Sequence, residues 1–120
     1  MHSAVRVAHT LEPGVEPGRI DDPVERSRLD RYLHSGTAVL FTTGKAPDVF
    51  APELGAVVPM SLRSDGEWVW SDAHAYYMEN YGLVTDEDLL AHIRAQSYVC
   101  RRIDGDEAER VLEAFYSATG

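Results

Sequence analysis

The spacing of apolar and polar residues changes several times along the chain, and each spacing predicts a type of element. Residues 23–35 carry apolar side chains three or four positions apart, as on one face of a helix, namely Leu29, Tyr32 and Leu33. Asp22 before this segment is a favoured N-cap residue, and Gly36 after it is a favoured stop. The segment is therefore predicted to form a helix with its apolar face toward a core.

Two segments joined by a turn predict a β-hairpin. Residues 56–63 alternate in polarity, and because Pro59 has no N–H for a ladder, this strand is expected at a sheet edge or with a bulge. A Ser-Asp-Gly turn then leads into residues 67–71. Trp68 and Trp70 are two positions apart on the second strand, so both side chains are expected on the same face of the sheet.

Five further elements follow from the same signals of pattern, cap and turn. They are a central strand at 37–43, a helix between Ser71 and Gly82, a helix opening at Thr85, a strand at 97–103 and a final helix after Asp104. This mixture predicts the α+β class, with a small, mostly antiparallel sheet and about four helices packed on one side.

The chain is expected to divide into an arm and one domain. Residues 1–21 contain two Pro-Gly pairs and are expected to form an N-terminal arm or short strand plus a linker. Residues 22–120 have the length of a single domain. Hydrophobic residues make up 44% of the chain, which is enough to build a core and too much for a disordered chain.

The composition is strongly acidic, with 20 Asp and Glu against 11 Lys and Arg and a formal net charge of −9. Nucleic acids and anionic membranes are held by clusters of Lys and Arg, so the composition argues against both as partners. A basic protein is the expected partner, since the net charge would attract it. No segment has the apolar length of a signal peptide or a membrane span, so a cytoplasmic location is expected.

Motifs that would identify a reaction or a bound group are missing from the sequence. There is no HExxH helix, GxSxG elbow or Gly-rich cofactor turn, and the single Cys100 can form no internal disulfide. His74 and Glu79 are five positions apart on one predicted helix, where their side chains are poorly placed to act together. We therefore expect no catalytic residue, no metal site, no cofactor and no enzyme activity.

Charge is segregated along the chain. No Lys or Arg occurs between Arg63 and Arg94, whereas acidic residues alternate there with Trp and Tyr. A field of one sign speeds the encounter with an oppositely charged partner, and aromatic residues are common anchors of interfaces. The residues expected to bind a partner are Asp65, Glu67, Trp70, Asp72, Tyr76, Glu79, Tyr81, Asp86, Glu87 and Asp88.

A resemblance to known proteins involves about half of the chain. The segments YLHSGTAVLFTT and VVPMSLRSDGEWVWSDAHAYYMENYGLVTDEDLLAHI resemble a group of small, uncharacterised actinobacterial proteins with an RxDGxWVW hairpin and a following YY helix. DGEWVWSD is the most specific part. The group has no agreed activity, so the resemblance implies no catalytic residue. Its small acidic members are similar to immunity proteins found beside secreted toxins.

These observations lead to one hypothesis and two alternatives. The hypothesis is an acidic protein-binding module, most concretely an immunity-type inhibitor that neutralises a basic toxin enzyme by occluding its active site. The first alternative is a structural or regulatory module that forms homo-oligomers through the exposed side of the hairpin. The second is a small-molecule-binding protein or enzyme with a pocket formed by Trp68, Trp70, His74 and Tyr77.

Overall fold

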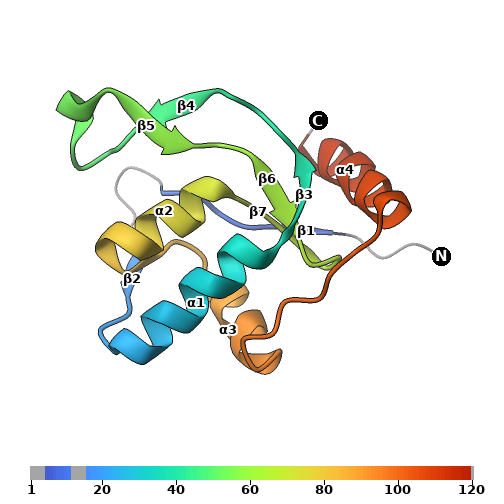
Figure 1. Cartoon of the computed structure of the whole chain (residues 1–120), viewed down its shortest axis with the longest axis horizontal. Helices are drawn as coiled ribbons and strands as arrows, with labels where there is room; N and C mark the ends of the chain where they lie inside the picture. The colour runs from blue at the N-terminus through green and yellow to red at the C-terminus, as the bar shows by residue number, and fades with distance from the viewer. Residues whose placement is uncertain (1–4, 12–15, 120) are drawn as a thin grey trace.

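Four strands form the main sheet, in the order β1-β7-β6-β3 (Figure 1). The computed structural model describes residues 5–11 and 16–119 of the chain. Its strands are β1 (Arg6–Val7), β2 (Gly18–Arg19), β3 (Thr37–Leu40), β4 (Lys45–Pro47), β5 (Ala56–Pro59), β6 (Leu62–Ser64), β7 (Trp68–Ser71) and β8 (Leu83–Val84). Its helices are α1 (Pro23–Ser35), the 3-10 turn η1 (Pro52–Leu54), α2 (Asp72–Tyr81), α3 (Glu87–Ala95) and α4 (Gly105–Thr119). The predicted α+β class is confirmed.

The β6–β7 hairpin is the centre of this sheet and is confirmed. Leu62 pairs with Ser71, and Ser64 pairs with Val69 in an antiparallel register. The turn contains Gly66 with a φ of 99°, a backbone conformation that glycine adopts without a side-chain penalty. The hairpin therefore places the two tryptophans on consecutive inward positions of β7.

The two faces of the sheet carry different cores. Trp68 and Trp70 lie in one buried cluster with side chains from α1, α2 and α3, as their spacing predicted. Val69 points to the opposite face, where it packs with Ile103 and Val111 of the C-terminal region. The prediction that all helices share one side is therefore wrong for α4, which covers the second face (Figure 1).

Three strand predictions are corrected. β3 is an edge strand, since among the described strands it pairs only with β6. The predicted strand 56–63 is split: β5 pairs with β4, while β6 belongs to the main sheet. Residues 97–103 form no strand, because Ser97 and Tyr98 have φ values of 54° and 62° and the Tyr98 hydroxyl donates to Glu25 on α1.

The helix boundaries follow the predicted caps closely. Asp22 caps α1 by accepting from the Val24 amide at 3.0 Å. Ser71 caps α2, which ends at Gly82 in the left-handed conformation. The α3 prediction was one residue early, because Asp86 and not Thr85 is its N-cap. None of the helices in the described ranges combines the length and apolar character needed to cross a bilayer.

The described part of residues 1–21 packs onto the remaining chain. β1 pairs in parallel with β7, and β2 pairs with β8. Ala8 and Ile20 are buried in the same core as the tryptophans. The predicted N-terminal arm and linker also include residues 1–4 and 12–15, which lie outside the described residues.

Candidate partner-binding surface

A second, two-stranded sheet forms an arm beside the main sheet. β4 and β5 pair with each other and with no other described strand. Figure 1 shows this hairpin extending along the molecule over α2, with η1 at its far end. We call residues 45–59 the arm and residues 48–55 the arm tip.

Asp48 holds the arm tip to α2. Its side chain is fully buried, and its Oδ2 accepts hydrogen bonds of 2.7 Å from the hydroxyls of both Tyr76 and Tyr81. Its Oδ1 accepts from the Phe50 amide at 2.8 Å. The Tyr77 hydroxyl accepts from the Val49 amide at 3.0 Å. Three tyrosines of one helix therefore fix the backbone of the arm tip.

The protonation states of this cluster follow from its hydrogen bonds. Burial alone would raise the pKa of Asp48, but donors from Tyr81, Tyr76 and the backbone outweigh it and lower this pKa. The hydrogen bond to Asp48 raises the pKa of Tyr81 to about 12 and also raises that of Tyr76. At neutral pH the cluster therefore holds one carboxylate and two hydroxyl donors, the pairing in which every contact is favourable.

The arm tip exposes three large apolar side chains. Val49, Phe50 and Leu54 are 59%, 53% and 59% exposed. The Phe50 ring also packs on Tyr81, with 5.0 Å between ring centroids, and edge-on against Tyr77 at 6.1 Å. Exposed hydrophobic side chains on a loop whose backbone is held in place are a feature of interaction sites.

The acidic residues expected to bind a partner do not form one free surface. Asp65 and Asp86 are buried, at 3% and 7% exposure. Asp72 pairs with Arg63 at 2.7 Å, and the Arg6 guanidinium contacts the Asp88 carboxylate at 3.0 Å. The sequence pattern missed this compensation because the cations come from outside the acidic stretch.

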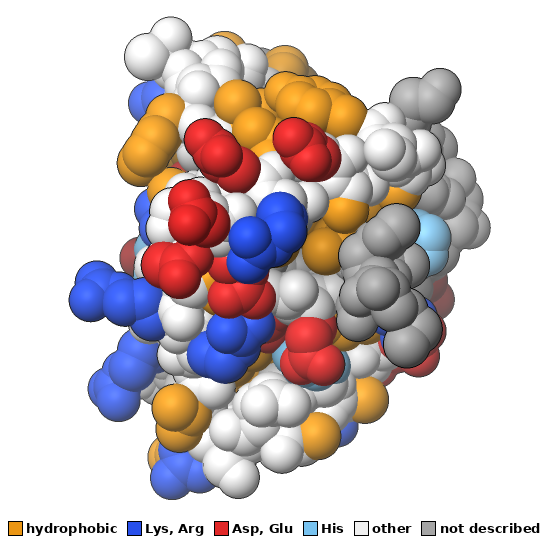
Figure 2. All heavy atoms as spheres, turned by 90° about the vertical axis from the view of Figure 1, so that its right-hand side faces the viewer, with side chains coloured by type: hydrophobic (Ala, Val, Ile, Leu, Met, Phe, Trp, Pro, Cys, Tyr) orange, Lys and Arg blue, Asp and Glu red, His pale blue; other side chains and the backbone are white. Residues whose placement is uncertain are grey.

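Three of the predicted acids are exposed and have no Lys or Arg within ion-pair distance among the described residues. They are Glu67, Glu79 and Glu87. Figure 2 shows the face that carries α4, where acidic and basic side chains lie intermixed. On this face the negative charge is therefore interrupted by basic side chains and is not gathered in one field.

The predicted aromatic anchors have other roles. Trp70 is 1% exposed and its Nε1 donates to the Leu33 carbonyl at 2.9 Å, so the expectation that it is an exposed anchor is wrong. Its large ring fills the core between the hairpin and α1, where it lies 5.7 Å from the Tyr32 ring. Tyr76 and Tyr81 are partly exposed, and both use their hydroxyls to hold Asp48.

Asp65 organises a second polar cluster at the hairpin turn. Its Oδ2 accepts from the Tyr32 hydroxyl and lies 2.6 Å from His92 Nε2, while Oδ1 accepts from the amides of Glu67 and Trp68. Burial alone would raise the pKa of Asp65, but these donors lower it. Sequence reasoning missed His92, because it lies on α3 far from the turn in the chain.

The surroundings of the Asp65 cluster indicate a structural role. A histidine next to a buried carboxylate is also a feature of acid-base sites. His92, however, packs on Trp68 with 6.2 Å between ring centroids, and its side chain is only 13% exposed. Cys100 lies near the cluster, and burial raises the pKa of its thiol to about 11, so it is a poor nucleophile at neutral pH.

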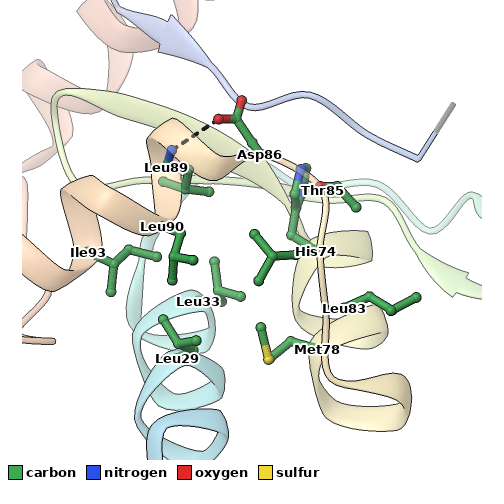
Figure 3. Close-up of a pocket in the computed structure, with 11 residues that line it drawn as sticks. Leu29, Leu33, His74, Met78, Leu83, Thr85, Asp86, Leu89, Leu90 and Ile93 are labelled. Atoms are coloured by element: carbon green, nitrogen blue, oxygen red, sulfur yellow. Dashed lines mark hydrogen bonds between the residues drawn. The ribbon is translucent and has the colours of Figure 1, made fainter. Parts of the chain in front are cut away.

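His74 lines one end of a small, mostly apolar pocket. Figure 3 shows apolar side chains of α1, α2 and α3 pointing into this space, with His74, Thr85 and Asp86 at one end. The pocket measures about 30 Å³, room for about one water molecule. His74 Nδ1 accepts from the Ser71 amide, and Nε2 contacts the His9 carbonyl at 2.9 Å. Both ring nitrogens are therefore engaged by polar groups of the protein itself.

The residues proposed for a small-molecule pocket are part of the packed interior. Trp68, Trp70, His74 and Tyr77 are each less than 9% exposed, and Tyr77 belongs to a different apolar cluster from the tryptophans. A polar hollow does lie at the end of α1, beside Arg63 and Arg102. The Arg63 guanidinium there is already bound to Asp72 and the Gly36 carbonyl.

Comparisons with known proteins gave no relative: no family model, no curated protein and no solved structure matched this chain. The site is therefore defined by its own geometry. The arm tip was not among the residues expected to bind a partner. The signal for it in the sequence is the apolar pair Val49 and Phe50, which follows Asp48 in a stretch that otherwise has the composition of a loop.

Proposed function

We propose that this chain is an acidic protein-binding module that contacts a basic protein through its arm tip. The most concrete form is an immunity-type inhibitor that occludes the active site of a basic toxin enzyme. The observation that carries the proposal is the arm tip itself, an exposed apolar loop whose backbone is fixed by Asp48 and three tyrosines.

The fixed conformation supports binding because ordering a loop on association costs free energy. Here the Val49 and Phe50 amides are already bonded within the free protein. An apolar side chain on such a loop can enter a pocket of a partner without that cost. Phe50 is the best candidate anchor, since its ring is half exposed and is supported from below by Tyr77 and Tyr81.

Net charge supports the choice of a basic partner. The chain carries a formal charge of −9, and Glu67, Glu79 and Glu87 leave exposed carboxylates on the surface. Such a charge accelerates encounter with a cationic protein and disfavours nucleic acid. In this mechanism charge steers the encounter, and the apolar arm tip supplies the contact.

Self-association through strand pairing receives less support. Proline occurs in both strands of the arm, as Pro47 in β4 and Pro59 in β5, and it has no N–H to donate to an added strand. The two end strands of the main sheet are also short, with two residues in β1 and four in β3. A second copy of the chain is an alternative occupant of the arm tip, so the test includes a measurement of the oligomeric state.

The test is a pull-down from the lysate of the source cells, with the tagged protein as bait and elution by increasing salt. We expect one basic protein that binds the wild type, and whose dissociation constant rises about 30-fold for Phe50→Ser, the size of a typical anchor residue. Phe41→Ser is the matched control, since Phe41 is 80% exposed but precedes the arm. Inhibition of an enzymatic activity of the captured protein would then test the immunity-type role.

Two outcomes would contradict the proposal. Equal loss of binding in the Phe41→Ser and Phe50→Ser variants would indicate general hydrophobic contact and no specific arm-tip site. Recovery of the bait alone, with concentration-dependent sedimentation that Phe50→Ser abolishes, would assign the arm tip to self-association.

A further inference from the structure

Asp30, His34 and Glu79 bring three metal-binding groups together on one side of the molecule. Asp30 and His34 are one turn apart on α1, and Glu79 comes from the neighbouring α2. One donor atom from each lies within 4.8 Å of the other two. His34 Nδ1 is 3.3 Å from Asp30 Oδ1, close to the separation of about 3.4 Å between donors that bind one tetrahedral zinc ion at 2.0–2.1 Å.

One oxygen of the Asp30 carboxylate accepts no hydrogen bond. Its Oδ1 is shielded from solvent and accepts no hydrogen bond. His34 Nδ1 is nearby, but its hydrogen bond goes to the Asp30 backbone carbonyl at 2.9 Å. A buried carboxylate oxygen that accepts nothing is unfavourable, and a cation at this position would remove the deficit.

The charge around this oxygen is also unbalanced. Asp30 and Glu79 have no Lys or Arg within ion-pair distance in the described ranges, and the basic group beside them is His34. Glu79 lies in the last turn of α2, and His34 lies in the last turn of α1. The helix dipole disfavours a carboxylate and favours a cation at these ends, so a bound metal ion would suit both helices.

We propose that Asp30, His34 and Glu79 form a binding site for a divalent transition metal, with zinc as the best fit. One imidazole nitrogen and two carboxylate oxygens suit zinc better than magnesium or calcium, which favour oxygen donors alone. The two carboxylates balance the charge of the ion. Three protein donors leave the fourth position of a tetrahedral site for water.

Binding through His34 Nδ1 requires the tautomer that carries its proton on Nε2. The imidazole then exchanges its hydrogen bond to the Asp30 carbonyl for the metal. The bound ion would link α1 to α2, the helix that also carries the tyrosines of the arm tip. This proposal rests on the helix pair alone and is independent of the proposed protein partner. The site could not be predicted from the sequence, because Glu79 is distant from the Asp30–His34 pair in the chain.

The test is calorimetric titration of the tag-free full chain with zinc chloride. We expect one saturable equivalent in the wild type, with affinity at least about tenfold lower in His34→Ala and in Glu79→Gln. Glu87→Gln is the matched control, since it removes an exposed carboxylate outside the site and should bind zinc as the wild type does. Cobalt substitution should give the absorption bands of a tetrahedral site, and these should be lost with His34→Ala.

The three side chains are at least partly exposed, so the variants should fold, and circular dichroism checks this for each. No saturable zinc binding by the wild type would overturn the proposal. Equal affinity in the wild type, His34→Ala and Glu79→Gln would overturn it too, because the ion would then bind at another histidine. Neither result would bear on the arm tip, which is tested by Phe50→Ser.

Discussion

Asp48 and Asp65 are two buried aspartates that use the same chemistry in different places. Each accepts from a tyrosine hydroxyl and from the amide two residues ahead, with Phe50 for Asp48 and Glu67 for Asp65. Asp65 stands at the turn that leads into the core strand β7. Asp48 stands at the start of the arm tip, whose side chains face solvent.

The difference between the two clusters supports the proposed binding role of the Asp48 cluster. The Asp65 cluster positions Trp68, which is buried in the main core, so stability explains it. The Asp48 cluster fixes a loop whose apolar side chains, Val49 and Phe50, gain little from burial in the free protein. An ordered loop that exposes apolar groups is better explained by binding than by stability.

Removal of the Asp65 carboxylate should have the largest effect. Asp65→Ala leaves the Tyr32 hydroxyl, His92 and two backbone amides without their acceptor. We expect the free energy of unfolding to fall by about 3–5 kcal/mol, as measured by urea denaturation. A loss below about 1 kcal/mol would contradict a central role for this turn.

Removal of the Asp48 carboxylate should have a smaller and more local effect. The arm is a two-stranded hairpin outside the main sheet, so after Asp48→Ala its freed groups can reach water. We expect a fall of about 1–2 kcal/mol in the free energy of unfolding, with weaker partner binding. A loss as large as that of Asp65→Ala would remove the distinction between the two clusters.

Acid should destabilise the fold in two phases, the first from His74 and the second from the two aspartate clusters. Burial lowers the pKa of His74, so the unfolded chain binds its proton more readily, and stability falls as pH drops below about 6.5. The pKa values of Asp48 and Asp65 are also lowered, so their contributions are complete above about pH 4 and are lost below it. Urea unfolding across this range should show both phases, and Asp65→Asn should reduce the second. A second phase unchanged by this substitution would contradict the assignment.

Surface charge should have the smallest effect, and only on association rate. Glu67→Gln combined with Glu87→Gln should slow association with the captured partner by a few-fold at low salt and flatten its salt dependence. The fold should be unaffected, because neither side chain is buried. An association rate equal to that of the wild type would show that these two carboxylates do not steer the encounter.

Local signals predicted much of the fold, since caps and alternation act over a few residues. Asp22, Ser71 and Gly82 mark real helix ends, and the hairpin with its inward tryptophans is where the alternation predicted it. The same signals could not place α4 on the second face or show that Pro59 divides one strand between two sheets. Those features depend on contacts between distant segments.

The candidate site was harder to predict for the same reason. The cluster of acids around Tyr and Trp suggested a surface, but Asp65 and Asp86 are buried acceptors and Trp70 is core. The compensating Arg6 lies outside the acidic stretch, and Arg63 borders it. Asp48, which gives the tyrosines their role, precedes them by about 30 residues, a separation at which sequence spacing carries no information about contact.

The measurement that tests the central claim most directly is amide hydrogen exchange of the free protein at the arm tip. The Val49, Phe50 and Ala51 amides all donate hydrogen bonds, so we predict protection in the wild type despite the exposure of the loop. Asp48→Ala should abolish this protection while the amides of β7 stay protected. Exchange of all three amides in the wild type at the rate of an unfolded chain would contradict a fixed arm tip.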